Sequence, residues 1–301
     1  MTSLLLLLAA AAGPGPADSL RATILSRIAR DSGAIVAVFL SDPVSGFFVA
    51  VNPDQRFHAA STMKVPVLIE LGRRIDAHQM RWSDSIPVKN EFASIVDGSP
   101  YTLDAGEDSD STVYQSIGAR LPLRQLATRM IVRSSNLATN LLIERLDAVR
   151  ITQTIRKLGA DSMLVLRGVE DGKAYAEGRN NTTTARDLAT LLLSLADGKA
   201  VGRETGAELL RILEAQEFND GIPGGLPPGT RVAHKTGEIT ATWHDAALVY
   251  PAGERARPYA LVVLTRGVPE RSRGMALQAD IARLAHAAVL DARASSRGRR
   301  P

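Results

Sequence analysis

Apolar residues recur along this chain with two different periods, and the change of period divides the sequence into parts. Near the start, a helix capped at Asp18 and Ser19 precedes two apolar runs, 34–40 and 46–51, which predict the strands of a hairpin. Strand patterns return late, over 231–235, 243–250 and 258–265, before an Ala- and Leu-rich helix over 274–290. Between them the apolar residues take helical spacing, which predicts helices over 64–78, 123–132, 138–146, 148–158 and 185–195.

This order of elements predicts an α/β (α+β) fold. The early hairpin and the late strands are expected to form one antiparallel sheet flanked by helices, with the middle helices inserted as an all-helical lobe. Residues 17–60 and 200–290 would form the α/β lobe, and residues 61–199 the helical lobe. Because no Pro- or Gly-rich linker separates the two lobes, we expect them to fold together around a cleft.

The two ends of the chain differ from its body. The apolar run 4–12 ends in small residues before Gly13-Pro14, so residues 1–16 are expected to be a signal peptide and the protein to be secreted or periplasmic. Since no Lys or Arg precedes Arg21, the leader would be a truncated one; the alternative is a buried N-terminal helix. Residues 291–301 are rich in Arg and Ser and are expected to be a flexible basic tail.

Composition excludes several classes of function. The net charge is +4, but much of it lies in the tail, so no nucleic-acid partner is expected. Cysteine is absent, which excludes disulfides and thiol nucleophiles, and no two histidines lie close in sequence, so we expect no metal and no cofactor. Glu107, Asp108 and Asp110 do not have the spacing of a calcium loop, and residues 97–112 are expected to be a solvated acidic loop.

The first candidate for chemistry is Ser61-Thr62-Met63-Lys64, where an apolar helical run begins. Helical spacing brings Lys64 beside Ser61, and a lysine with a lowered pKa can take the proton of a serine nucleophile. The pattern S-x-x-K is expected about once by chance in a chain of this length. However, the chain has only six lysines among many arginines, and an arginine could not be deprotonated at this position.

The second candidate is Lys235-Thr236-Gly237, at the end of a late strand. Lys235 and Thr236 can hold a substrate carboxylate, and Gly237 would let the substrate backbone approach the strand edge. The N–H of Glu238 could join the N–H of Ser61 in an oxyanion hole, the arrangement that stabilises acyl transfer.

The third candidate is Ser134-Ser135-Asn136, between two predicted helices. Ser134 could pass a proton to a leaving nitrogen, and Asn136 offers a donor and an acceptor to a substrate amide. Taken alone, Asn136 is equally well explained as a helix cap.

Together the motifs occur in the order S-x-x-K, S-x-N, K-T-G, the set found in β-lactamases and penicillin-binding proteins. The chain resembles the class A β-lactamases and their serine-hydrolase relatives over nearly its whole length. The resemblance implies bacterial origin, Ser61 as the acylated nucleophile, Lys64 as its base partner, Ser134 as proton shuttle, and Asn136, Lys235 and Thr236 as substrate-binding residues. Thr182-Thr183-Thr184 is similar to the end of the family's omega loop.

Two positions depart from the family pattern. Ser135 stands where these enzymes carry an aspartate thought to brace the cleft. In the loop from Arg167, one extra residue precedes Glu170, the candidate for the deacylating base, with Asn180 or Asn181 as its partner. The alternative is that Glu170 is a solvated loop carboxylate.

Three functions remain open from the sequence: a β-lactamase, a slowly deacylating cell-wall D,D-peptidase or esterase, and a binding module without turnover. The substrate would be a β-lactam or a peptidoglycan peptide, and a monomer is expected. A Ser-His-Asp hydrolase is disfavoured because G-x-S-x-G is absent and none of the five histidines lies in a motif. His234 is expected to be a strand residue beside the cleft.

Overall fold

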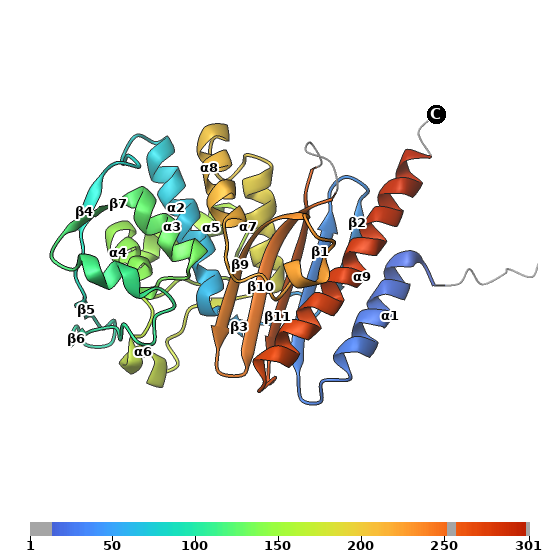
Figure 1. Ribbon diagram of the computed structural model, residues 1–301, viewed down its shortest axis with the longest axis horizontal. Coiled ribbons are helices and arrows are strands. Elements are labelled where there is room, and N and C mark those ends of the chain that lie inside the picture. Colours follow the sequence, from blue (N-terminus) through green and yellow to red (C-terminus); the bar gives the residue numbers. More distant parts are fainter. Residues whose placement is uncertain (1–13, 252–256, 299–301) are drawn as a thin grey trace, which may run out of the picture.

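The early and late strands join in one five-stranded antiparallel sheet. We describe residues 14–251 and 257–298 of a computed structural model. The strand order is β2-β1-β11-β10-β9, so the first hairpin adds directly to the strands near the C-terminus (Figure 1). This confirms the predicted sheet, whose strands are β1 Ile35–Asp42, β2 Phe47–Val51, β9 Arg231–Ile239, β10 Thr242–Tyr250 and β11 Tyr259–Arg266.

The two faces of the sheet belong to two apolar clusters. Val38 and Val263 face the helices α1 (Pro16–Ile28) and α9 (Arg271–Arg297), which lie side by side on one face (Figure 1). Their neighbours in the strands, such as Phe39 and Val262, point the other way into a larger cluster. Side chains alternate along a strand, so a central strand covered on both faces is apolar throughout, as β1 and β11 nearly are.

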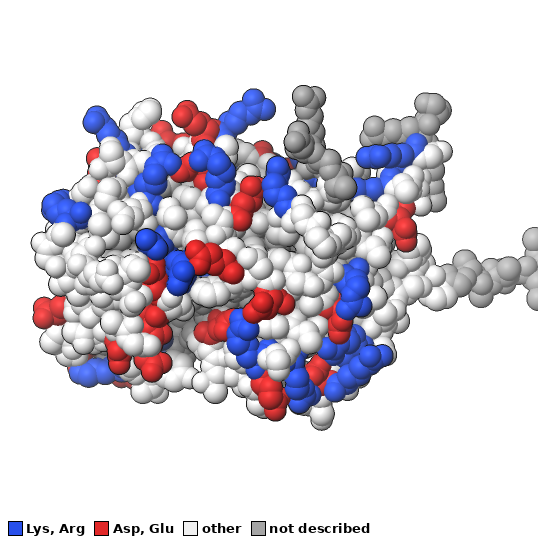
Figure 2. Space-filling model, viewed as in Figure 1, with Lys and Arg blue, Asp and Glu red and all other residues white. Residues whose placement is uncertain are grey.

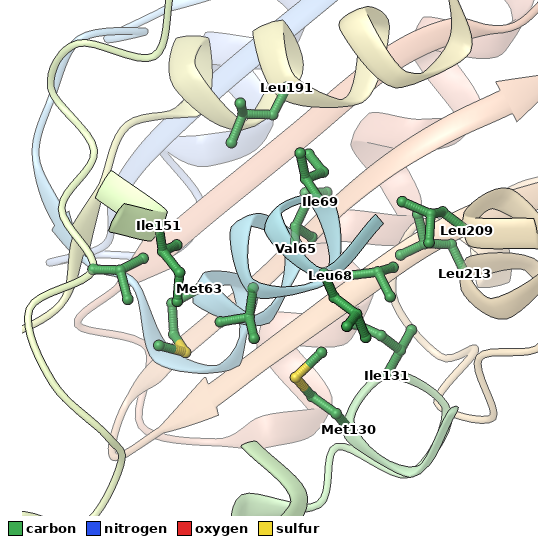
Figure 3. Close-up of a cluster of buried hydrophobic side chains, with 14 of the residues drawn as sticks. Met63, Val65, Leu68, Ile69, Met130, Ile131, Ile151, Leu191, Leu209 and Leu213 are labelled. Carbon is green, nitrogen blue, oxygen red and sulfur yellow. The ribbon is translucent and has the colours of Figure 1, made fainter. Parts of the chain in front are cut away.

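The larger cluster joins the sheet to the helical part of the chain. At its centre lies α2, whose first nine residues, Lys64 to Gly72, are all buried. Figure 3 shows Leu68 of this helix among apolar side chains from several other helices. The helices around it are α3 Leu123–Val132, α4 Asn136–Leu146, α5 Ala148–Lys157, α7 Ala185–Ala196 and α8 Arg203–Glu214, with α2 itself spanning Lys64–Asp76.

Short elements complete the described chain, and one pair of them positions the site. β3 (Phe57–His58) pairs with β8 (Thr182–Thr183), which ties the segment before Ser61 to a distant loop. The others are η1 Ala60–Met63, β4 Ser85–Pro87, β5 Phe92–Ala93, β6 Pro100–Tyr101, η2 Ser111–Ser116, β7 Arg120–Pro122, α6 Gly172–Ala176 and η3 Pro223–Gly225.

The helices α7 and α8 show where the sequence expectation was incomplete. α8 was not predicted, although its apolar residues Leu209, Ile212 and Leu213 have helical spacing and are buried. α7 falls within the range assigned to the helical lobe, yet it packs on the sheet against β11. The division into lobes at 61 and 199 stays a prediction, because one continuous cluster crosses it.

The expected flexible tail at 291–301 is wrong for its first part. α9 continues to Arg297, and Arg293 is buried against Asp42, with Nε 2.9 Å from Oδ2 and Nη2 2.6 Å from Oδ1. A bidentate ion pair of this kind holds the end of the helix on β1. Residues 299–301 lie outside the described residues, as do residues 1–13 of the expected signal peptide.

The surface carries both signs of charge. On the face seen in Figure 2, Lys and Arg side chains are intermixed with Asp and Glu. Many of these groups form ion pairs across elements, such as Arg271 with both Asp220 and Glu238. Within the described part of the chain, no helix is both long and apolar enough to span a bilayer.

Candidate active site

Ser61 lies in the 3-10 turn η1, which is followed directly by α2 at Lys64. Its position is set from the N-terminal side, because the β3–β8 pair and the hydrogen bond from Ala59 N to Asn181 O (2.9 Å) fix the incoming strand. Ala60 has a φ of 46°, a conformation that alanine rarely adopts. Such backbone strain is often found at functional sites, and Ser61, the next residue, is partly exposed.

Lys64 is fully buried and its ammonium is surrounded by oxygen atoms. Its Nζ donates to Ser134 O at 2.6 Å, Ser134 Oγ at 3.1 Å and Asn136 Oδ1 at 2.8 Å. These use all three protons of the ammonium. Burial, and then the charge of Lys235, lower the pKa of Lys64 well below its usual range. Lys64 is thus suited to lose a proton and act as a base, although the described side chains make no hydrogen bond between Lys64 Nζ and Ser61 Oγ.

Ser134, in the S-x-N motif, contacts a lysine from each of the other two motifs. It lies between α3 and α4 with a φ of 58°, which turns the chain sharply toward the cleft. Lys235 Nζ donates to the same Ser134 Oγ at 3.1 Å that Lys64 contacts. One hydroxyl therefore bridges two buried lysines, an arrangement that can relay a proton between them.

Lys235 and Gly237 lie on β9, the strand at the edge of the sheet nearest η1. Lys235 is fully buried, and burial lowers its pKa to about 7. A Cβ atom at Gly237 would lie 3.1 Å from the backbone nitrogens of both Ser61 and Thr62. Glycine thus favours close packing of β9 on the nucleophile turn, a reason that adds to the predicted approach of a substrate.

Glu170 lies on the loop between α5 and α6, and its carboxylate reaches the site. Its Oε1 accepts a hydrogen bond from Asn136 Nδ2 at 2.7 Å. Burial raises the pKa of Glu170 above its usual value, although the contact with Asn136 opposes that shift. A carboxyl with a raised pKa beside a buried lysine is suited to general-base chemistry.

The loop that carries Glu170 is held from both sides. The backbone N–H of Val169 donates to Asn140 Oδ1 on α4 at 2.7 Å, and Asn140 Nδ2 donates to Val169 O at 3.0 Å.

The expected partnership of Asn180 or Asn181 with Glu170 is wrong. Asn180 Oδ1 accepts from Arg167 Nη2 at 2.9 Å, and Asn181 Oδ1 accepts from the backbone N–H groups of Leu166 and Arg167. Both asparagines therefore close the base of the loop and do not contact Glu170.

A cavity of about 270 Å³ brings these groups together, and Ser61, Asn136, Glu170 and Glu238 all line it. Larger hollows of about 630 and 740 Å³ lie elsewhere on the described surface, but none of the predicted site residues lines them. The remaining lining residues come from the nucleophile segment, the 167–181 loop and the end of β9: His58, Ala60, Arg167, Val169, Asp171, Gly172, Tyr175, Asn181 and Ile239.

The histidines do not form a serine triad in the described structure. His234 is a buried residue of β9, as expected, and its ring contacts Asp245 at 2.9 Å and Asn219 at 3.2 Å. His58 lines the cavity, but its Nδ1 accepts from Ala60 N at 3.0 Å. His58 and Lys64 each lie three residues from Ser61, but His58 Nδ1 is occupied by Ala60 N, so the buried Lys64 is the better candidate for the base.

The acidic loop was predicted incorrectly. Glu107 is exposed, but Asp108 and Asp110 are buried, and Asp108 accepts hydrogen bonds from the first N–H groups of α4. Asp110 caps the 3-10 turn η2 by accepting from Thr112 N at 3.0 Å. These two carboxylates therefore have structural roles at the start of α4 and of η2.

A serine and a carboxylate thus line one cavity, and two buried lysines that share one hydroxyl lie next to it, joined to its wall through Asn136. Residues 19–289 match the model of a family described as the β-lactamase enzyme family.

The chain belongs to this family.

Curated relatives and solved structures agree with it. A β-lactamase of Rhodobacter capsulatus is 26% identical over 245 residues, which are 79% of this chain and 78% of that protein. A β-lactamase of Streptomyces fradiae is 26% identical over 94% of this chain and 92% of its own length. The solved structure of PBP-A has a TM-score of 0.77 at 26% identity, covering 91% of this chain and 96% of that one.

Two residues that hold the site together were not identified from the sequence. Asn140 was missed in the sequence, although it is a polar residue one helical turn after Asn136 and is flanked by the apolar run Leu141–Ile143. Asp108 gave no usable signal, because its partners lie 28 and 29 residues away in the chain.

Proposed function

We propose that this protein is a serine β-lactamase that opens the β-lactam amide through an acyl-enzyme on Ser61. The observation that carries this proposal is the convergence of Lys64 and Lys235 on one hydroxyl, Ser134 Oγ, next to the cavity that Ser61 and Glu170 line. A serine and a lysine of lowered pKa are the parts that acylation needs.

In the proposed acylation, neutral Lys64 takes the proton of Ser61 as Oγ attacks the carbonyl carbon. The backbone N–H groups of Ser61 and Glu238 stabilise the oxyanion. When the C–N bond breaks, Ser134 gives its proton to the leaving nitrogen and recovers one from Lys64, its neighbour at 3.1 Å. Lys235 and Thr236 hold the carboxylate of the substrate, which anchors the ring during both steps.

In the proposed deacylation, Glu170 takes a proton from water as the water oxygen attacks the ester carbon. The bond between the ester carbon and Ser61 Oγ then breaks, Glu170 returns its proton to Oγ, and the opened product departs. The raised pKa of Glu170 and its place in the cavity wall support this role.

The alternative is a penicillin-binding peptidase that deacylates slowly and acts on peptidoglycan peptides. It is favoured by the hydrogen bond that holds Glu170 on Asn136, which could keep the carboxylate from a hydrolytic water. It is also favoured by the similarity to PBP-A, a mutant of which is described in acyl-enzyme complex with penicillin-G.

Mass spectrometry of the purified protein with a chromogenic cephalosporin separates the two. We expect sustained colour with little protein adduct, and neither colour nor adduct for Ser61→Ala. A stable adduct after one burst of colour would support the peptidase. Absence of both signals in the unmodified protein would contradict the assignment of Ser61.

We also propose that the apolar run 4–12 directs export, which would bring the enzyme to extracellular β-lactams and cell-wall peptides. Expression in a bacterium should yield a shortened protein outside the cytoplasm, with its new N-terminus near residue 16. Retention of the full-length chain in the cytoplasm would contradict this proposal.

A further inference from the structure

Asp108 lies in the loop between β6 and η2, yet only 8% of its surface is exposed. Both carboxylate oxygens accept from Asn136 N, at 3.0 and 2.9 Å, and Oδ2 also accepts from Leu137 N at 3.0 Å. Oδ1 further accepts from Asp110 N at 3.0 Å, which holds the loop itself. A buried carboxylate with this many N–H donors is strongly bound in one position.

These contacts complete the beginning of α4. The first N–H groups of a helix have no partner within the helix. In α4, Asp108 accepts from the first two, at Asn136 and Leu137, and Ser135 Oγ accepts from the third, at Ala138 (3.2 Å). A negative charge is also favoured at this end of a helix. Asp108 and Ser135 therefore cap the N-terminus of α4 together, whereas a single side chain often caps a helix.

Ser135 is the residue where the resemblance to class A enzymes leads one to expect an aspartate, and it is fully buried. A carboxylate is nevertheless present at this point of the cleft wall, supplied from a loop 28 residues away. We propose that Asp108 is a positioning residue that replaces the missing aspartate and holds Ser134 and Asn136 in place against Lys64. This inference rests on the proposed acylation at Ser61.

The segment that Asp108 holds, Ser134 to Leu137, must keep one conformation for Lys64 to retain its hydrogen bonds. Ser134 has a φ of 58°, a conformation that persists only when surrounding contacts impose it. Two of the three acceptors of the Lys64 ammonium are on Ser134 and the third is on Asn136. A shift of about 1 Å in this segment would misplace the proton shuttle and cost about 100-fold in rate.

The charge of Asp108 also acts on Lys64. Asp108 and Glu170 raise the pKa of Lys64, against burial and Lys235, which lower it. Removal of the Asp108 charge should therefore lower the pKa of Lys64 further. The acid limb of the acylation rate would move to lower pH, a change that a merely structural residue would not produce.

The test compares Asp108→Ala, Asp108→Asn and the double variant Asp108→Ala/Ser135→Asp with the unmodified protein. Glu107→Gln is the matched control, because Glu107 is the exposed neighbour in the same loop. The acylation rate with penicillin is followed by mass spectrometry across pH, and hydrogen exchange of residues 133–138 reports the start of α4.

We expect Asp108→Ala to acylate about 10- to 100-fold more slowly, with faster exchange at Asn136 and Leu137. Asp108→Asn should show the shifted acid limb, and it serves as the test if the alanine variant does not fold. Ser135→Asp in the double variant should recover most of the lost rate, and Glu107→Gln should match the unmodified protein.

The proposal is overturned if both single variants at Asp108 acylate within twofold of the unmodified protein, or if their exchange at Asn136 and Leu137 is unchanged. It is also overturned if Glu107→Gln has the same effect as Asp108→Asn. If the unmodified protein itself forms no acyl adduct, the proposed function fails, whereas the exchange experiment still decides whether Asp108 holds this segment.

Discussion

At the scale of single residues, the site depends on two lysines that have been taken out of water. Lys64 and Lys235 are both fully buried, and both have pKa values lowered by that burial. Hydrogen bonds to oxygen atoms, chiefly those of Ser134, hold the two amino groups in place, and neither makes a direct ion pair with a described side chain. Small changes in pH or in a neighbouring charge should therefore change catalysis.

The substitution Glu170→Gln should separate the two halves of the reaction. The amide oxygen of the introduced glutamine keeps the acceptor for Asn136, so acylation should continue, but the base is lost. We expect deacylation to slow by about 100-fold or more, with the acyl adduct accumulating in mass spectra. Unchanged turnover would mean that Glu170 is a loop carboxylate without a catalytic role.

The lowered pKa of Lys235 predicts how substrate binding depends on pH. Because burial brings this pKa to about 7, the ammonium that holds the substrate carboxylate is lost as the pH rises above 7. We expect KM for a penicillin to increase by up to about tenfold per pH unit there. Lys235→Arg, which stays charged, should give a flatter profile. A KM that does not change as the pH rises from neutral into the alkaline range would contradict this explanation.

At the scale of elements, helix ends and strand edges decide where the catalytic groups lie. η1 places Ser61 against the edge strand β9, and glycine at 237 favours that approach because a Cβ atom there would crowd the backbone of the turn. The C-terminal part of α9 also anchors the helix, because Arg293 on it forms a buried ion pair with Asp42 on β1. An arginine in a tail rich in Ser and Arg therefore contributes to the packing of the sheet.

Loss of one partner of this buried ion pair should be costly. Arg293→Ala would leave the Asp42 carboxylate buried without its main partner, and we expect the free energy of unfolding to fall by about 3–5 kcal/mol. Arg297→Ala, at the exposed end of the same helix, should change it by less than about 0.5 kcal/mol. Denaturant unfolding of both variants measures the difference, and equal stabilities would mean that the pair does not anchor α9.

At the scale of the whole molecule, the cavity exists because two groups of elements share one core. Apolar side chains of α2 and α7 lie in the same cluster as those of β1 and β11. The three motifs come from η1, the α3–α4 junction and β9, so the site is complete only when all of them have packed. Folding of either part without the other would leave the site unformed.

This shared core predicts a single cooperative unfolding transition. In calorimetry, the measured enthalpy should equal the van't Hoff enthalpy, and loss of activity should coincide with loss of secondary structure. Two separate transitions, with one of them belonging to residues 61–199, would show that the helical part folds by itself.

Much of this protein follows from its sequence alone. The periods of the apolar residues predicted the sheet and most of the helices, because burial of one face imposes its period on the chain. Motif order identified Ser61, Lys64, Ser134 and Lys235, and the fold joins the two lysines through Ser134 and places Ser61 at the adjoining cavity. These features depend on local spacing, which a sequence displays directly.

Other features were decided by tertiary structure. Asp108 is buried at α4 instead of solvated, Glu170 is paired with Asn136 instead of Asn180 or Asn181, and Arg293 is buried instead of flexible. Their partners lie 28, 34 and 251 residues away along the chain. An isolated charged residue carries no sign of a distant partner, and its free energy of burial depends on that partner being present. Only the packed fold determines which charges are buried and which remain in water.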